Sequence, residues 1–136
     1  MDRQGRQGRQ EPSALADAAA TQVIDAGLKV HKALGPGLLE SAYELCLAHE
    51  LNLRGLRVSR QVPLPVQYEG LRLEAGYRLD LVVEDVVVIE VKSVESLSRL
   101  HGAQLITYLK LSGLHLGLLM NFNVTLFKDG VRRLVG

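Results

Sequence analysis

The chain has little of what would place it in several large classes of protein. Its 136 residues include one cysteine, no tryptophan, two phenylalanines and four tyrosines. The lone Cys46 excludes an internal disulfide and a zinc cluster built on cysteines. No apolar run approaches the ~18 residues that a membrane span needs, and the polar, arginine-rich N-terminus lacks the apolar core of a signal peptide. These absences predict an intracellular, cytoplasmic protein with no membrane partner and an aliphatic core.

The chain also has no marked excess of positive or negative charge. Sixteen lysines and arginines against fifteen aspartates and glutamates give a formal net charge of +1. A nearly neutral chain has no general attraction to nucleic acid, so binding of that kind needs a local patch. The sequence also lacks a glycine-rich phosphate loop, a Gly-x-Ser-x-Gly elbow and a His-Glu-x-x-His metal motif.

Two helices are predicted ahead of the strands. Residues 1–12 repeat Arg-Gln-Gly and are predicted to be a disordered tail, with a single domain over 13–136. A stripe of apolar residues at spacings of three and four predicts a helix from an N-cap at Ser13 to a Gly-Pro-Gly break, with His31 as a cation near its C-terminal end. A second helix is predicted over about 38–54. Its core side is expected to comprise Leu39, Tyr43, Cys46, Leu47 and Leu51.

Short apolar segments predict the strands. They lie at 58–62, 64–68, 71–75, 77–83 and 87–92, then, after a third helix at about 99–112, at 115–121, 124–128 and 131–135. The last two are expected to form a hairpin around an Asp-Gly turn. Two prolines in the first two strands favour an edge position, and exposed edges would allow a homodimer. The order αα-βββ(β)-α-ββ predicts an α/β fold, a mixed β-sheet flanked by helices.

Three ionisable residues interrupt the most apolar part of the chain. Asp80 lies in the 77–83 segment, and Glu90 and Lys92 lie in the next one. Glu90 and Lys92 are two apart in a strand and therefore share a face. A two-residue turn at Glu84-Asp85 would set Asp80 opposite Ile89, on the other face. An odd-length loop or a bulge would set it opposite Glu90, and we predict one of these.

Two interpretations of this group stay open. Two carboxylates about 5 Å apart repel by roughly 3 kcal/mol at an effective dielectric near 20, and a divalent cation with oxygen ligands, such as magnesium, would reverse that. Alternatively, Lys92 forms a buried ion pair with Asp80 or Glu90 that serves the fold alone.

The pattern Asp80, nine residues, Glu90-Val91-Lys92 resembles the Asp…Glu-x-Lys signature of the PD-(D/E)XK nuclease superfamily. Residues 37–43, Gly-Leu-Leu-Glu-Ser-Ala-Tyr, resemble the Gly-x-x-Glu-x-x-Tyr motif of its GxxExxY family. Gln104 and Tyr108 resemble the Gln-x-x-x-Tyr helix of RecB-type nucleases, and residues 117–122 resemble the late strand with its Asn-Phe end. The resemblance spans about 21–135.

This resemblance implies a restriction-endonuclease-like core and a Mg²⁺- or Mn²⁺-dependent nuclease acting on phosphodiester bonds, with DNA as the expected partner. It implies that Asp80, Glu90 and the backbone carbonyl of Val91 hold the metal and that Lys92 orients or deprotonates the attacking water. Glu40 would complete the acidic cluster, directly or through a water; its plain alternative is a favourable charge at a helix start.

Further residues have candidate roles in the same site. Gln104 and Tyr108 would brace it or contact the strand being cut. The residues that could contact nucleic acid are Arg78, Arg99, His101 and Lys110. The simpler role of the arginines and the lysine is a solvated surface charge. The alternative function is a catalytically silent nuclease fold that binds nucleic acid or a protein.

Overall fold

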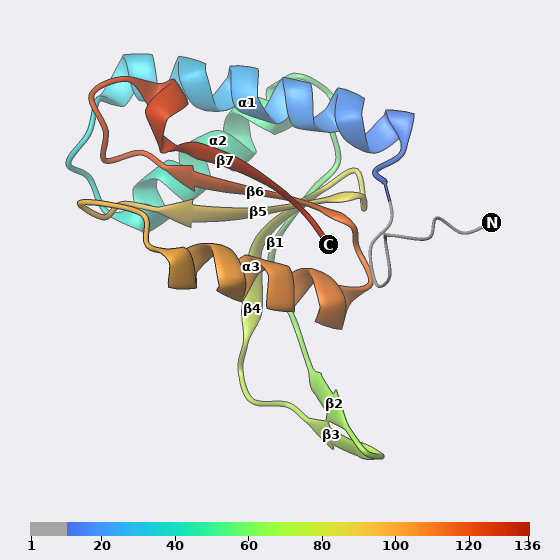
Figure 1. Ribbon diagram of the computed structural model, residues 1–136. Coiled ribbons are helices and arrows are strands. Elements are labelled where there is room, and N and C mark those ends of the chain that lie inside the picture. The colour runs from blue at the N-terminus through green and yellow to red at the C-terminus, as the bar shows by residue number, and fades with distance from the viewer. Residues whose placement is uncertain (1–10) are drawn as a thin grey trace.

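A five-stranded mixed sheet forms the centre of the computed structural model, which describes residues 11–136 (Figure 1). The strand order is β1-β4-β5-β6-β7, with β5 and β6 parallel and the other neighbours antiparallel. These strands are β1 (Val58–Pro63), β4 (Arg78–Val83), β5 (Val87–Lys92), β6 (Leu116–Asn121) and β7 (Val131–Val135). The short strands β2 (Val66–Tyr68) and β3 (Leu71–Leu73) form a separate hairpin that projects from the body.

Helices cover both faces of the sheet. Helices α1 (Ala14–Leu34) and α2 (Glu40–Leu53) lie on one face and α3 (Arg99–Ser112) on the other (Figure 1). Alternate residues of β4 and β5 contribute to two hydrophobic cores, one on each face of the sheet. Val83 packs toward α1 and α2, whereas Val82 packs toward α3. The α/β fold class expected from the sequence is confirmed.

Local signals in the sequence account for most element ends. The Ser13 hydroxyl accepts the Ala16 N–H at 3.0 Å and caps α1. Gly113 closes α3 in the left-handed conformation, with φ 78°. Strand β6 is buried along its whole length, as its continuous apolar run predicts. Strand β1 is an edge of the large sheet, also as expected; the pairing of two copies through such an edge stays a prediction.

The expected hairpin around Asp129-Gly130 is wrong. Residues 127–130 form a short 3₁₀ helix, η1 (Phe127–Gly130), and β7 pairs with β6 instead of with a strand at 124–128. The glycine serves close packing rather than a β-turn: a Cβ on Gly130 would lie 2.1 Å from the Asn121 carbonyl oxygen.

Two expectations about the helices are also wrong. Cys46 is exposed and Leu39 is 77% exposed, whereas Glu44 and Ala48 are buried beside Tyr43. The buried stripe of α2 is therefore rotated from the one drawn on apolar residues alone.

His31 lies in the last turn of α1, as predicted, but its side chain is buried. It is 6% exposed, and its Nε2 lies 2.7 Å from the Val124 carbonyl oxygen. Its ring packs against Phe122 and Phe127, with centroids 6.5 and 5.5 Å away. The apolar stripe predicted for α1 is buried only from Ala16 to His31, because Leu15 and Leu34 at its two ends are exposed.

Most of the predicted tail, residues 1–12, lies outside the described part of the chain. Within residues 11–136, no helix has the length and apolar character needed to cross a membrane.

Candidate metal centre

The loop between β4 and β5 decides which side chains meet. Glu84 and Asp85 both have positive φ, 53° and 58°, and the Val86 N–H donates to the Val83 carbonyl oxygen at 3.0 Å. This is a two-residue type I′ turn followed by Val86 as one extra residue before β5. The resulting pairs run from Val83↔Val87 to Leu81↔Ile89. The predicted odd-length connection is thus confirmed, and the next position sets Asp80 opposite Glu90.

The two carboxyl groups replace main-chain bonds at this position. The Asp80 N–H donates to Glu90 Oε2 at 3.1 Å, and the Val91 N–H donates to Asp80 Oδ2 at 2.9 Å. The β4–β5 ladder ends at Leu81, while β4 continues beside β1 to Arg78 and β5 continues beside β6 to Lys92. Asp80 and Glu90 therefore face each other where β4 and β5 part.

Glu40 reaches this region from the first turn of α2. Its Oε2 accepts the Ser93 N–H at 3.3 Å, and the Ser93 hydroxyl donates to the Leu38 carbonyl oxygen at 2.6 Å. These two bonds tie the start of α2 to the residue that follows Lys92. The Glu-x-x-Tyr helix and the Glu-x-Lys strand are consequently neighbours, although about 50 residues separate them in the sequence.

Tyr43 fixes the chain that leads into Glu40. Its hydroxyl donates to the Gly35 carbonyl oxygen at 2.5 Å and accepts the Leu38 N–H at 3.0 Å. Its ring is fully buried and stacks on Phe122, with centroids 4.6 Å apart and planes 9° apart. The tyrosine of the motif is thus a structural bracket around the Gly-Pro-Gly junction, and it orients the helix start that carries the glutamate.

A fourth carboxylate, on Glu44, was missed in the sequence. It is 6% exposed, pairs with Arg60 Nη2 at 3.0 Å and accepts two bonds from the Gln61 side-chain amide at 2.9 and 3.0 Å. The only sequence signal was its position four residues after Glu40, one turn along the same helix face. Its negative charge acts on both Asp80 and Glu90.

Burial dominates the electrostatics of the acidic pair. It raises the pKa of Glu90 from its ordinary value of 4.5 to about 8, with the charge of Asp80 as the next cause. Burial also raises the pKa of Asp80; the Val91 N–H opposes this shift, and Glu44 and Glu40 add to it. Without a cation, the site therefore favours retaining a proton at neutral pH.

Lys92 follows Glu90 on the same strand face and is half-buried. Its charge lowers the pKa of both Asp80 and Glu90. Within residues 11–136 it forms no ion pair with either of them, so the alternative of a fold-stabilising ion pair has no such contact to support it.

Helix α3 brings Tyr108 toward the same place. Tyr108 is half-buried, and its pKa is raised by burial and then by the negative charge of Glu90. Its ring lies against Tyr77, with centroids 6.4 Å apart. Gln104, one turn earlier, is exposed.

The four candidate nucleic-acid contacts are spread over two elements. Arg78 begins β4, and its Nη1 donates to the Gln61 carbonyl oxygen at 3.4 Å. Arg99 and Lys110 are exposed at opposite ends of α3. His101 Nδ1 accepts the Ser98 N–H at 2.9 Å and completes a capping box, so this ring nitrogen is already used at the helix start.

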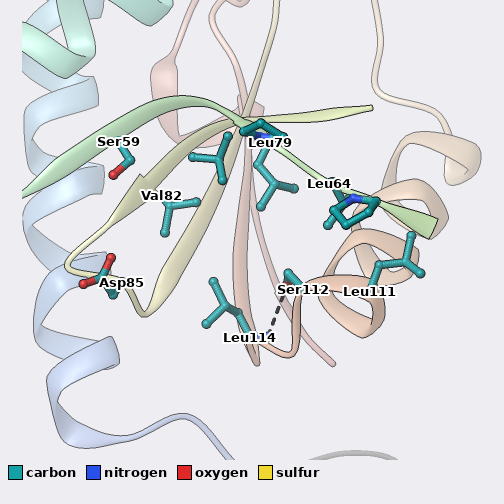
Figure 2. Close-up of a pocket in the computed structure, with 11 residues that line it drawn as sticks. Ser59, Leu64, Leu79, Val82, Asp85, Leu111, Ser112 and Leu114 are labelled. Carbon is teal, nitrogen blue, oxygen red and sulfur yellow. Dashed lines mark hydrogen bonds between the residues drawn. The ribbon is translucent and has the colours of Figure 1, made fainter. Parts of the chain in front are cut away.

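Two hollows flank the sheet. A mostly apolar cavity of about 340 Å³ lies between β1, β4 and the C-terminal end of α3, and Figure 2 shows Leu64, Leu79, Val82 and Leu111 around it. No predicted site residue lines it. A hollow of about 400 Å³ instead lies beside the acidic cluster. Its lining residues are Leu38, Leu39, Glu40, Ser41 and Ser93.

The oxygen donors at Asp80 and Glu90 are of the kind that magnesium prefers. Within the part of the chain that the structure describes, no three His, Cys, Asp or Glu side chains form a ready-made metal cluster. Magnesium, however, is usually held by one or two carboxylates and keeps several waters. Asp80 Oδ1 and Glu90 Oε1 make no hydrogen bond within residues 11–136, since the bonds described above use the other oxygens. Two free carboxylate oxygens, one on the half-buried Asp80 and one on the buried Glu90, fit such a metal.

The fold and the acidic pair together define the class, an α/β domain with a restriction-endonuclease-like core. The family model described as the PD-(D/E)XK nuclease superfamily matches residues 17–134, nearly the whole described chain. The protein belongs to the PD-(D/E)XK nuclease superfamily. Comparisons with curated proteins and with solved structures gave no match.

Proposed function

We propose that the protein is a magnesium-dependent nuclease of the GxxExxY branch that hydrolyses phosphodiester bonds in DNA. The observation that carries the proposal is the Asp80–Glu90 pair, a half-buried and a buried carboxylate set against each other without an ion pair within residues 11–136. A buried cluster of like charges costs stability unless a cation compensates it. Superfamily membership supports phosphodiester chemistry as the use of that cation.

Asp80, Glu90 and the Val91 carbonyl oxygen would hold the metal, with Glu40 contributing directly or through a water. When bound, the cation would supply Lewis-acid stabilisation to the phosphoryl oxygen. Lys92 lies on the strand face of Glu90, where its ammonium group would orient or deprotonate the attacking water and offset charge on the phosphate. Tyr108 lies close enough to Glu90 to feel its charge, which supports a role for the Gln104–Tyr108 face in bracing the site.

Nucleic acid would approach along α3 and the start of β4. Arg78, Arg99 and Lys110 are exposed there and would contact phosphates. The His101 side chain would do so only through its Nε2, because Nδ1 caps the helix.

The test is a cleavage assay with purified protein, magnesium or manganese, and a panel of single- and double-stranded DNA and RNA. We expect the parent protein to cut DNA. A chelator should abolish this cleavage, and so should the Lys92→Ala substitution. Lys32→Ala, which removes the same charge from an exposed position on α1 that has no proposed role in the site, serves as the control and is expected to retain cleavage. Cleavage that persists in Lys92→Ala would come from a contaminant and would contradict the proposal.

The alternative function, a catalytically silent nuclease fold that only binds, rests on one observation of its own. Each carboxylate of the pair already accepts a main-chain N–H from the facing strand, which gives both a structural use without metal. Under this alternative the protein would bind nucleic acid or a protein, with or without magnesium, and would cut nothing.

A further inference from the structure

Strand β1 contains a residue in an unfavourable backbone conformation directly across from the acidic pair. Gln61 has φ 53°, in the left-handed region that residues with a Cβ avoid. The β1–β4 pairs Arg60↔Leu81 and Val62↔Leu79 bracket Gln61 and Asp80, which form no pair of their own. The distortion of β1 therefore lies at the register position of Asp80.

The side chains of β4 change the face of the sheet to which they point at this position. Leu79 and Leu81 are two apart and would share one face of a regular strand. Instead, Leu81 packs in the core under α1 and α2, whereas Leu79 packs in the core under α3. The change of face falls at Asp80, where β4 also leaves β5. The change of face therefore coincides with the position at which Asp80 and Glu90 bond to the facing strands.

A buried carboxylate binds the side chain of Gln61. The Gln61 amide Nε2 donates to both oxygens of Glu44, at 3.0 and 2.9 Å, and Arg60 pairs with Glu44 at 3.0 Å. Glu44 is 6% exposed, and a charged acceptor in such a place binds its donors strongly. On the other side, Arg78 Nη1 donates to the Gln61 carbonyl oxygen.

We infer that Glu44 is a positioning residue: through Gln61 it fixes the bend in the β1–β4 pair that lets Asp80 face Glu90. The inference rests on the proposed function for its consequence, since the bend matters because it shapes the metal site. Glu44 is not among the residues proposed to touch metal or substrate. It acts by keeping one residue of β1 left-handed.

Two variants of one residue separate the backbone effect from the lost side chain. Gln61→Gly and Gln61→Ala both remove the amide that binds Glu44, but glycine adopts positive φ freely and alanine does not. Calorimetric titration with Mn²⁺ is expected to give Gln61→Gly within about threefold of the parent affinity. Gln61→Ala is expected to bind about five- to tenfold more weakly, the order of the left-handed penalty. Gln67→Ala, in the exposed hairpin, is the matched control.

A metal-free readout makes this test independent of nuclease activity. The amide resonances of Asp80 and Val91 report the two carboxylate bonds directly. We expect both to shift in Gln61→Ala and in Glu44→Ala, and to stay near their parent positions in Gln61→Gly. Equal behaviour of the glycine and alanine variants, in affinity and in amide resonances, would overturn the inference. If the parent protein bound no metal, the proposed function would fail and the resonances would still decide this point.

Discussion

Replacing Glu90 by glutamine is expected to stabilise the metal-free protein at pH 8 and to leave its stability almost unchanged at pH 4.5. The glutamine keeps the size of the side chain, and its carbonyl oxygen can still accept the Asp80 N–H. What it removes is the buried charge. The variant thus mimics the protonated carboxyl group that burial favours in the folded chain.

The size of the effect follows from the two pKa values of Glu90. The folded protein holds the proton up to about pH 8, whereas the unfolded chain releases it near 4.5. Between these values the folded state binds more protons, so stability is fully present below 4.5 and falls as pH rises through 8. At ~1.4 kcal/mol per pKa unit, the loss has an upper limit of about 5 kcal/mol.

Thermal unfolding in chelator, from pH 4.5 to 8.5, measures this loss. The parent protein should lose Tm across the range and Glu90→Gln should not, with about 3 °C for each kcal/mol in a chain of this size. Adding magnesium at pH 8 should restore the parent and leave the variant unchanged. Glu95→Gln removes a charge from an exposed loop position and is the control. If the Tm of the parent and of Glu90→Gln changed with pH in the same way, the raised pKa of Glu90 would not be the cause.

Three further changes have defined outcomes. Lys92→Ala should abolish cleavage yet cost under about 1 kcal/mol in thermal unfolding, because Lys92 forms no ion pair within the described residues; a large loss would make it a structural residue. Gly27→Ala should destabilise by about 1–3 kcal/mol in urea, since the new Cβ would lie 2.5 Å from the Met120 methyl group; a neutral result would show that this contact yields freely. Asn121→Ala should cost about 2–3 kcal/mol, because Asn121 is 1% exposed and binds both the N–H and the carbonyl oxygen of Val94; unchanged stability would mean that water replaces both bonds.

The sequence predicted the parts of the site that depend on period and register. Asp80, Glu90 and Lys92 could be placed together because a strand has a period of two and because only an odd connection sets Asp80 opposite Glu90. Glu40 could be added only through the motif that it shares with Tyr43. The bond that ties Glu40 to Ser93 is tertiary and has no local signal.

The errors have a common physical cause, which is partnering between distant segments. Glu44 looks like a surface residue until Arg60 and Gln61 surround it, and its burial rotates α2 so that Cys46 faces outward. The Asp-Gly pair at 129–130 has the composition of a hairpin turn. Its glycine is needed instead because Gly130 passes against the Asn121 carbonyl, a contact that only the folded chain creates.

Calorimetric titration of Mn²⁺ into the purified protein at neutral pH tests most directly whether Asp80 and Glu90 hold one divalent cation between them. Coordination of one cation by both carboxylates predicts one ion per chain, with binding lost in Asp80→Asn and in Glu90→Gln and retained in Glu95→Gln. Binding of the ion by Asp80→Asn with the parent affinity would contradict it.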